Sequence, residues 1–382
     1  MIRHTASVNP APPPTSLARL LAARIRETGP MSLADFMAEA LFHPAQGYYT
    51  NAEIFGRAGD FTTAPEISQM FGELTGLWLA AQWLAQGARD APQLIELGPG
   101  RGTLMDDMLR ATRIVPEFQD KATVHLVEAS PQLRDRQRET LAGHTGRLAL
   151  HWHDSLSAID EAAGPLFLIA NEFFDALPIH QFELTPSGWR ERMVGLTDSE
   201  DGFRFGLAPG ESRFAPLLPP AEAARAGGGP TPAIAEFCPA AVTIAGDIAR
   251  RIRNAGGAAL IIDYGYAAPA FGDTLQAVRR HAFADPLATP GEADITAHVD
   301  FSRLASAAAA EGARALGPVG QGAFLDRLGL RERAEILAKS GDADVLAQAD
   351  RLAAPGEMGT LFRALAILPP ETAGPVAGFE TP

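Results

Sequence analysis

A glycine-rich turn with an acidic residue before it is the feature of this sequence best suited to chemistry. The segment LIELGPGRG carries glycines at alternate positions, Gly98, Gly100 and Gly102, and Glu96 stands two residues before the first of them. Glycine lets the backbone turn sharply and lets a ligand approach it closely. Dinucleotide-binding turns usually have the spacing G-x-G-x-x-G, which leads a pyrophosphate to a helix N-terminus. The shorter G-x-G-x-G spacing favours a ligand with positive charge and no phosphate, although Gly-Pro-Gly is also found in turns without a ligand.

Polar residues follow the next three expected strands and would lie near the same ligand. They come after strands predicted at 123–127, 148–152 and 166–170 and are Glu128, Asp154, Ser155, Asn171 and Glu172. In open α/β sheets, ligands bind outside the carboxyl ends of the strands. S-adenosylmethionine fits such a site: Glu128 would accept from the ribose hydroxyls, Asp154 and Ser155 would lie near the adenine, and Asn171 and Glu172 where methyl donor and acceptor meet. Any one of these residues could instead be a helix cap.

The segment 59–63 lies between two expected helices, before the first strand of the sheet. It could fold over the methionine end of the cofactor, with Asp60, Thr62 and Thr63 as polar contacts. Aspartate and threonine are also good helix-capping residues, so a capped turn is the alternative interpretation.

Glu172 and Asp175 are the candidates for holding a methyl acceptor. The acceptor that would need them most is arginine, which stays protonated and has a delocalised nitrogen lone pair. An enzyme that methylates arginine must orient the planar guanidinium, concentrate its charge on one end and let it lose a proton. Carboxylates do the first two through paired hydrogen bonds. Capping of the turn at Leu177–Pro178 is the alternative role for Asp175.

His298 and Asp300 alternate with apolar residues in the segment 295–301. They would share one face of a short strand or extended loop, where a histidine and a carboxylate together can bind a substrate or accept its proton. A purely structural histidine is the alternative. The sequence has no acidic or histidine cluster at ligand spacing, so we expect no metal site.

Alternating strands and helices are expected to position these residues. Strands are predicted at 93–97, 123–127, 148–152, 166–170 and 258–263, and helices at 104–112, 133–141 and about 244–255. This alternation is typical of a parallel, doubly wound sheet, whose buried strands read as continuous apolar runs such as LFLIA and AALII. The sequence therefore predicts a Rossmann-like α/β fold.

The rest of the chain is expected to surround this core. Three helices, ending with one over 66–86, are predicted before the first strand. The expected parts are a disordered arm over 1–15, a helical N-terminal cap over 16–90, a methyltransferase domain over 91–370 with insertions near 205–235 and 285–352, and a tail over 371–382. The first insertion is expected to be irregular because it is rich in Pro, Gly and Ala. The second is expected to face the substrate.

Composition narrows the class of protein. The net charge of −14 disfavours nucleic-acid binding, because phosphate contacts need a surplus of basic surface, and suits a basic protein partner. Cys238 is the only cysteine, which rules out a disulfide within the chain and a cysteine-based metal cluster. No apolar run of about 18 residues occurs, so no stable membrane insertion is expected. A cytoplasmic enzyme is the default expectation, and the oligomeric state is left open.

Several longer stretches resemble one family, the MidA-like complex I assembly factors, which are protein arginine methyltransferases of mitochondria and bacteria. In the order of the chain, the matching stretches are FMAEALFHPAQGYYT, GRAGDFTTAPEIS, ELGPGRG, ANEFFDALP, GDTLQAVRRHAFADPLATPGEADITAHVDF and MGTLFRAL. They run from about Leu33 to about Leu365. The departures lie in the insertions, notably around Gly227–Pro232.

The resemblance implies a Rossmann-like methyltransferase with S-adenosyl-L-methionine as cofactor. It also implies symmetric dimethylation of an arginine in a protein substrate, such as the quinone-site subunit of respiratory complex I, in the bacterial cytoplasm or the mitochondrial matrix of a eukaryote. Two alternatives remain at this point. One is a small-molecule methyltransferase, and the other is a non-catalytic assembly chaperone that keeps the fold.

Overall fold

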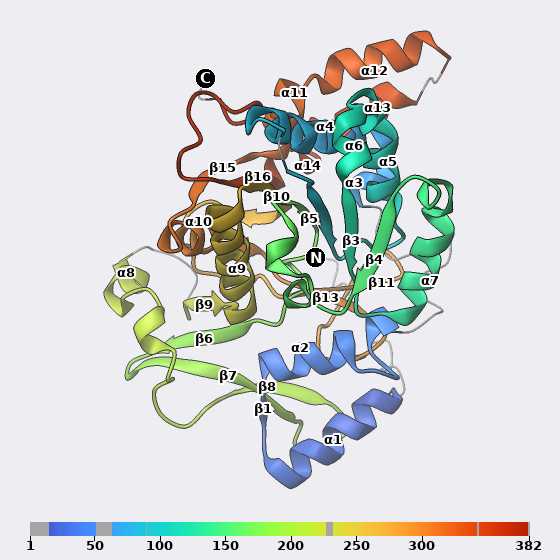
Figure 1. Cartoon of the computed structure of the whole chain (residues 1–382). Helices are drawn as coiled ribbons and strands as arrows, with labels where there is room; N and C mark the ends of the chain where they lie inside the picture. Colours follow the sequence, from blue (N-terminus) through green and yellow to red (C-terminus); the bar gives the residue numbers. More distant parts are fainter. Residues whose placement is uncertain (1–14, 51–62, 89, 227–231, 342–343, 381–382) are drawn as a thin grey trace, which may run out of the picture. The chain divides into compact units, whose positions relative to one another are not determined.

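The computed structural model describes residues 15–50, 63–88, 90–226, 232–341 and 344–380 (Figure 1). The chain divides into two compact units, and each is built from three separate segments. The first unit comprises residues 1–60, 178–237 and 271–297, and the second comprises 61–177, 238–270 and 298–382.

A central sheet forms the middle layer of the second unit. Its five parallel strands are, in spatial order, β10 (Gly257–Tyr266), β5 (Leu166–Asn171), β2 (Gln93–Leu97), β3 (Thr123–Val127) and β4 (Ala149–His153). The sequence predicted all five, although β10 runs three residues beyond the predicted end at Asp263. Buried parallel strands lack an alternating pattern, and their continuous apolar runs made them recognisable.

Three further strands extend this sheet. β16 (Phe362–Leu368) pairs antiparallel with β10, β15 (Arg314–Gly320) pairs antiparallel with β16, and the short β14 (Val299–Asp300) continues beside the end of β10. β15 and β16 were not predicted, and β14 lies in the segment 295–301, where a short strand or an extended loop was expected. Part of the region 285–352, expected to be a substrate-side insertion, therefore belongs to the central sheet.

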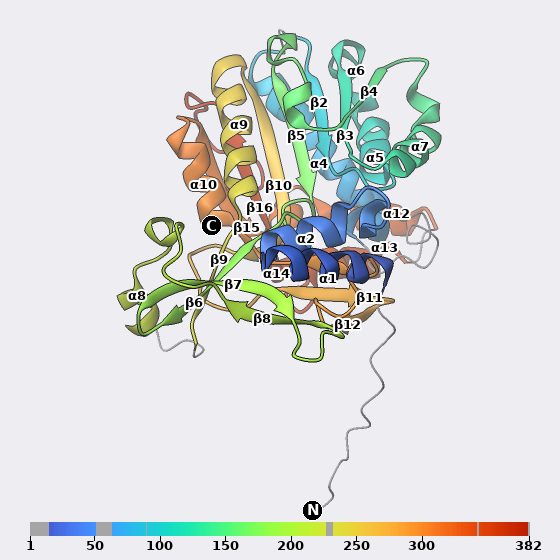
Figure 2. The same cartoon turned by 90° about the horizontal axis from the view of Figure 1, so that it is seen from below.

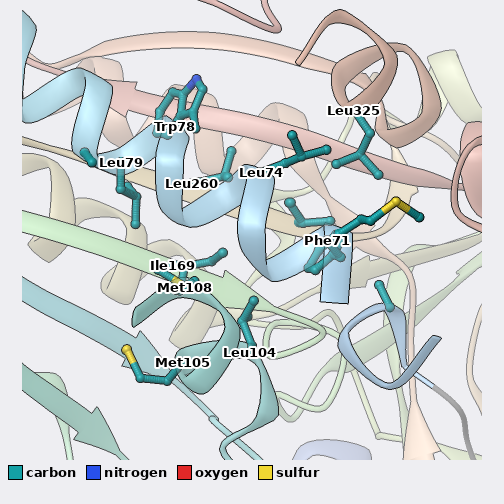
Figure 3. Packing of buried hydrophobic residues seen from close by; sticks show 14 of the residues in the cluster. Phe71, Leu74, Trp78, Leu79, Leu104, Met105, Met108, Ile169, Leu260 and Leu325 are labelled. Atoms are coloured by element: carbon teal, nitrogen blue, oxygen red, sulfur yellow. The ribbon is translucent and has the colours of Figure 1, made fainter. Parts of the chain in front are cut away.

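Helices cover both faces of the central sheet. Helices α4 (Gln69–Ala85) and α5 (Thr103–Ala111) pack on one face, and α9 (Pro239–Ala255) and α10 (Phe301–Ala310) pack on the other. Successive strand side chains point to opposite faces. Figure 3 shows the first of these layers, in which the α4 and α5 side chains meet the β5 and β10 side chains. The two-sided layering confirms the predicted doubly wound α/β fold.

The strand order creates a place for a ligand beside β2. From β2 the chain adds β3 and β4 on one side, and it then returns to place β5 on the other side. The connections on the two sides leave β2 and β5 in opposite directions, which opens a crevice at their carboxyl ends. Residues after β2, β3, β4 and β5 are therefore expected to meet at one edge.

The helix predicted over 66–86 is two helices. Helix α3 (Ala64–Ile67) ends directly before Ser68, and α4 starts directly after it. Ser68 has an extended backbone, with φ −157°, and its hydroxyl accepts the Met70 N–H at 3.3 Å. A serine side chain that caps a helix start explains the break, which apolar periodicity does not reveal.

The first unit holds two antiparallel sheets with α1 (Ser16–Thr28) and α2 (Leu33–Phe42). The larger sheet contains β1 (Met31–Ser32), β6 (His180–Thr185), β7 (Gly188–Leu196), β8 (Phe203–Leu207) and β9 (Ile234–Phe237). The smaller contains β11 (Gln276–Arg279), β12 (Ala282–Ala284) and β13 (Asp294–Thr296). The region expected to be a helical cap over 16–90 is thus divided, since α1 and α2 lie in this unit and α3 and α4 in the second.

Shorter helices complete the described chain, and Figure 2 shows them from below. They are α6 (Pro116–Lys121), α7 (Pro131–Thr140), α8 (Ala221–Ala226), α11 (Gln321–Arg327), α12 (Leu330–Lys339), α13 (Val345–Ala353) and α14 (Met358–Leu361). The insertion expected to be irregular around 205–235 contains α8 and ends in β9. Within the described ranges, no helix has both the length and the apolar character needed to cross a membrane.

Candidate functional site

The glycine turn connects β2 to α5 and leaves room beside its backbone. Gly98, Gly100 and Gly102 all have left-handed backbones, with φ of +63°, +52° and +84°. A Cβ built on Gly100 would meet no protein atom within 4 Å, whereas one on Gly98 would lie 3.0 Å from the Phe173 ring. Left-handed conformations favour glycine. The open space at Gly100 is what a closely approaching ligand requires, so the turn fits the adenosyl cofactor that the sequence indicates.

Glu96 lies in β2 directly beneath this turn and is 3% exposed. Its Oε2 atom is buried and has no hydrogen-bond partner among the described residues. Burial, followed by the nearby charge of Glu128, raises the pKa of the carboxyl to about 8. The negative charge expected to attract a cationic ligand is therefore disfavoured at neutral pH until a cation binds nearby and lowers the pKa again.

Glu128 follows β3, as predicted, and its carboxylate is held from two sides. Oε1 accepts the Ser130 N–H at 2.8 Å, and Oε2 accepts from the Gln137 side-chain amide at 3.3 Å. Burial raises the pKa of Glu128, while these hydrogen bonds oppose the shift. A carboxylate fixed in this way is suited to accept from ribose hydroxyls, which remains a prediction for Glu128.

Asp154 and Ser155 follow β4 at the same edge of the sheet. The Asp154 carboxylate forms an ion pair with the Arg134 guanidinium and is 85% exposed. The Ser155 hydroxyl shares a hydrogen bond of 2.9 Å with Ser157. Their position beside the adenine stays a prediction. Asp154 would have to bind both Arg134 and the ligand.

Two residues that the sequence did not single out tie this edge together. Arg134 on α7 donates from Nε to the Glu128 backbone carbonyl at 2.7 Å and also pairs with Asp154, so it links the ends of β3 and β4. Gln137 on the same helix is 0% exposed and bonds both the Gly100 carbonyl and Glu128. Nothing in the segment PQLRDRQRET distinguishes these side chains from the solvated face of a helix.

Asn171 is the last residue of β5, on the other side of β2, and Glu172 follows it. Glu172 has a left-handed backbone, with φ +48°, which is unusual for a residue other than glycine. Its N–H donates to the Ile262 carbonyl at 2.9 Å, and its Oε1 accepts from Ala64 N–H at 3.3 Å and from the Asn171 amide at 3.2 Å. Backbone strain of this kind concentrates at functional sites.

A second carboxylate layer lies behind Glu172. Asp263 on β10 is fully buried, and its Oδ2 accepts the N–H groups of Phe174 at 3.0 Å and Asp175 at 3.2 Å. Burial raises the pKa of Asp263, with smaller contributions from the charges of Asp175 and Glu172. The sequence showed Asp263 at a strand end, the same signal that identified Glu128, but we did not predict a role for it.

Asp175 is buried in the same cluster. Burial raises its pKa to about 6, although a hydrogen bond from the Tyr264 side chain opposes the shift. Its Oδ1 has no hydrogen-bond partner among the described residues. Within the described ranges, no basic side chain bonds to Asp175 or Asp263, so the cluster is short of positive charge.

His298 lies beside this cluster, and Asp300 has another role. The His298 ring meets the Tyr264 ring edge to face, with centroids 5.5 Å apart, and burial lowers the pKa of the imidazole. Asp300 instead caps α10 by accepting the Arg303 N–H at 3.1 Å and pairs with the Arg303 guanidinium. Asp300 therefore has a structural role at the start of α10, and both the joint action of His298 and Asp300 and a neutral His298 near the acceptor site stay predictions.

The loop predicted to close over the methionine end is described only at its last residue. Asp60 and Thr62 lie outside the described residues. Thr63 precedes α3, and its side chain makes no capping hydrogen bond there. Its predicted contact with the cofactor stays a prediction. No group of three or more His, Cys, Asp or Glu side chains in the described ranges could hold a metal ion.

Comparisons with known proteins identify the family of the chain. Residues 74–319 match the model of a family described as S-adenosyl-L-methionine-dependent methyltransferases. The chain is 39% identical to the mitochondrial protein arginine methyltransferase NDUFAF7 of Rattus norvegicus, over 93% of this chain and 85% of that protein. It is 38% identical to the same-named protein of Danio rerio, over 95% and 92%.

A solved structure is similar over nearly the whole length. It comes from Burkholderia thailandensis, is bound to S-adenosyl-homocysteine, and superposes with a TM-score of 0.81 at 29% identity. The similarity covers 97% of this chain and 98% of that one. A cofactor product is thus bound by a protein of this fold and length.

Proposed function

The chain belongs to this family of S-adenosyl-L-methionine-dependent methyltransferases, and we propose that it methylates an arginine side chain of a protein substrate. The curated relatives named NDUFAF7 are protein arginine methyltransferases and are matched over most of their length.

The observation that carries the proposal is the acidic cluster where β5 ends beside β10. Glu172, Asp175 and Asp263 lie together there, and no basic side chain bonds to the two aspartates in the described part of the chain. Buried carboxylates are costly unless a cation compensates them. An arginine side chain from a substrate would supply that cation.

The cluster adjoins the cofactor turn. Leu97, the last residue of β2, pairs with Ala170 in β5, and Phe173, one residue after Glu172, packs against Gly98. Acceptor and donor sites therefore lie at the ends of neighbouring strands. Such an arrangement would let the enzyme align an acceptor nitrogen with the methyl group supplied by a cofactor bound beside the glycine turn.

Glu172 and Asp175 have distinct parts in the proposed mechanism. The bound cofactor supplies a methyl group on a positively charged sulfur. Glu172 hydrogen-bonds the guanidinium and holds one nitrogen toward that methyl group. The same carboxylate stabilises the positive charge as the nitrogen attacks. Asp175 Oδ1, which has no partner in the described chain, is available to take the proton that the nitrogen loses.

The proposed target is an arginine in the subunit that lines the quinone site of respiratory complex I. The resemblance to complex I assembly factors supports this target, and the net charge of −14 favours a basic protein partner. The reaction would take place where that subunit is assembled, in the bacterial cytoplasm or the mitochondrial matrix.

Mass spectrometry tests the proposal directly. The quinone-site subunit would be isolated from a wild-type strain and from a strain that lacks this gene, and its arginine-containing peptides compared. We expect one arginine to be symmetrically dimethylated in the wild type and unmodified in the deletion strain. Identical arginine masses in both strains would rule out this target. Labelled S-adenosylmethionine, added with purified enzyme to the deletion extract, would then reveal whether another protein, a small molecule or nothing is methylated.

A further inference from the structure

Gln137 is a fully buried side chain that contacts two parts of the cofactor site at once. Its Nε2 donates to the Gly100 backbone carbonyl at 2.8 Å and to Glu128 Oε2 at 3.3 Å. Its Oε1 accepts the Trp152 indole N–H at 2.9 Å. One amide on α7 therefore joins the glycine turn after β2, the carboxylate after β3, and a ring on β4.

Trp152 fixes which way round the amide lies. An indole nitrogen can only donate a hydrogen bond, so the atom that faces it must be the amide oxygen. The amide nitrogen is then directed to Gly100 and Glu128, which offer only a carbonyl and a carboxylate. All three contacts are satisfied in this orientation and would be lost or repulsive if the amide were turned over.

The same helix holds the glycine turn at a second point. Thr140, three residues after Gln137, donates from its hydroxyl to the Arg101 carbonyl at 2.8 Å. Residues three apart lie on one face of a helix. Two successive carbonyls of the turn are thus bonded to one face of α7, next to the position where a Gly100 Cβ would meet no protein atom.

We propose that Gln137 is a positioning residue of the cofactor site, acting through Gly100 and Glu128. It holds the turn open at Gly100 and aims the Glu128 carboxylate, and Trp152 keeps its amide in the required orientation. Gln137 itself need not touch the cofactor. The proposal concerns cofactor binding alone and does not depend on arginine being the acceptor.

Binding of S-adenosylhomocysteine, measured by titration calorimetry, tests the proposal. Gln137→Met keeps the length of the side chain and removes its hydrogen bonds, and we expect affinity to fall roughly 10- to 100-fold, as for lost bonds to a buried carboxylate. In Gln137→Glu the affinity should fall at least as far, because the substitution places a second carboxylate against Glu128.

A matched control separates positioning from general stability. Gln119 is also buried in the second unit, and its amide bonds the Leu109 carbonyl and the Thr112 hydroxyl, away from the turn. Gln119→Met should lower the melting temperature by a similar amount and leave affinity within about twofold. Equal losses of affinity in the Gln119 and Gln137 variants would overturn the proposal.

A double-mutant cycle tests whether Gln137 acts through Glu128. In a Glu128→Ala background, the factor by which Gln137→Met lowers S-adenosylhomocysteine affinity should be at least threefold smaller than in the wild type. An unchanged cost would contradict the coupling. If the Gln137 variants fail to fold, Trp152→Phe tests the proposal instead. This substitution frees the Gln137 amide to turn over, so it should reduce S-adenosylhomocysteine affinity about threefold or more. Wild-type affinity in the Trp152→Phe variant would count against the proposal.

Discussion

Asp263 accepts the backbone N–H of Asp175 over 3.2 Å, so one buried carboxylate holds the main chain that carries another. The contact lies where β5 ends beside β10, with Ile262 opposite Asn171 in the sheet register. Because Asp263 also holds the Phe174 N–H, the loop after β5 is anchored from behind. Glu172 begins this loop, and its strained backbone is kept in place by these contacts.

Glu172→Gln should separate methyl transfer from cofactor binding. The amide keeps the shape of the side chain and removes the charge that orients a guanidinium. We expect S-adenosylhomocysteine affinity within about twofold of wild type and a loss of turnover of 100-fold or more, since the interaction strengthens in the transition state. Turnover would be followed with labelled cofactor, with Glu335→Gln on an exposed helix face as control. Full activity of Glu172→Gln would exclude the proposed role.

Gly100→Val should abolish binding of S-adenosylhomocysteine. The new side chain would occupy the open space beside the turn, and its left-handed backbone would be strained. Gly374 is the matched control, since it is also left-handed, with φ +80°, and its Cβ would also meet nothing within 4 Å. Gly374→Val should be destabilised to a similar degree but bind normally. If calorimetry showed that Gly100→Val binds S-adenosylhomocysteine with wild-type affinity, the cofactor would not bind at this turn.

Glu96→Gln should change how stability depends on pH in the unliganded protein. Burial raises the pKa of Glu96 from its ordinary value of 4.5 to about 8, so the unfolded chain releases this proton at a lower pH than the folded one does. Wild-type stability is therefore lost as pH rises from about 4.5 to 8. An amide does not titrate. Between pH 5 and pH 8, the free energy of unfolding of the variant should therefore rise by on the order of 3 kcal/mol relative to that of the wild type. Urea unfolding at three pH values would measure the difference, and parallel curves would show that Glu96 is not responsible.

The histidine group on β3 and β4 should make the second unit sensitive to acid. His125 Nε2 faces Gln93 Oε1 at 2.7 Å and so carries the proton, while its Nδ1 lies 2.9 Å from His153 Nε2 and must accept. Burial, then the charges of His153 and His151, lowers the pKa of His125 from 6.5 to about 4. The unfolded chain thus binds the proton first, and stability should fall by about 2 to 3 kcal/mol as pH drops from 6.5 to 4.

His125→Gln tests this dependence, with exposed His281→Gln as control. The His125 variant should be less stable at pH 7 but should lose less on acidification than wild type does. Thermal unfolding at pH 7, 5.5 and 4.5 measures both effects. If wild type and the His125 variant lose stability equally between pH 7 and 4.5, another group causes the acid sensitivity.

The sequence predicts the central layers and the helices α1 and α2 well, but it predicts the sheets of the first unit poorly. Strands such as β5 and β10 are buried on both faces and appear as unbroken apolar runs. Strands β6 and β7 are only half-buried, and residues such as Glu191 and Arg192 interrupt their apolar positions. Their pairing is fixed by neighbours distant in sequence, which local patterns do not report.

The positions of the candidate residues at one edge of the sheet were predictable where the residues lie at strand ends, and not where they reach this edge from a helix. Glu128 and Glu172 stand directly after apolar runs, and the ends of parallel strands meet by geometry. Asp263 carried the same signal. Gln137 did not, because a polar residue in a charged helix is usually solvated, and only the packing of α7 against the turn buries it.

The placement of β16 at the end of the chain has a consequence for how the protein is made. β10 has β5 as one neighbour, which leaves the ribosome early, but its other neighbour is β16, at residues 362–368. Until those last residues emerge, one edge of a deeply apolar strand is open, and such edges promote aggregation in nascent chains. Premature termination shortly before Phe362 would therefore leave β2 and β3, which carry the predicted cofactor residues, intact. It would still produce a chain that chaperones must hold or proteases remove.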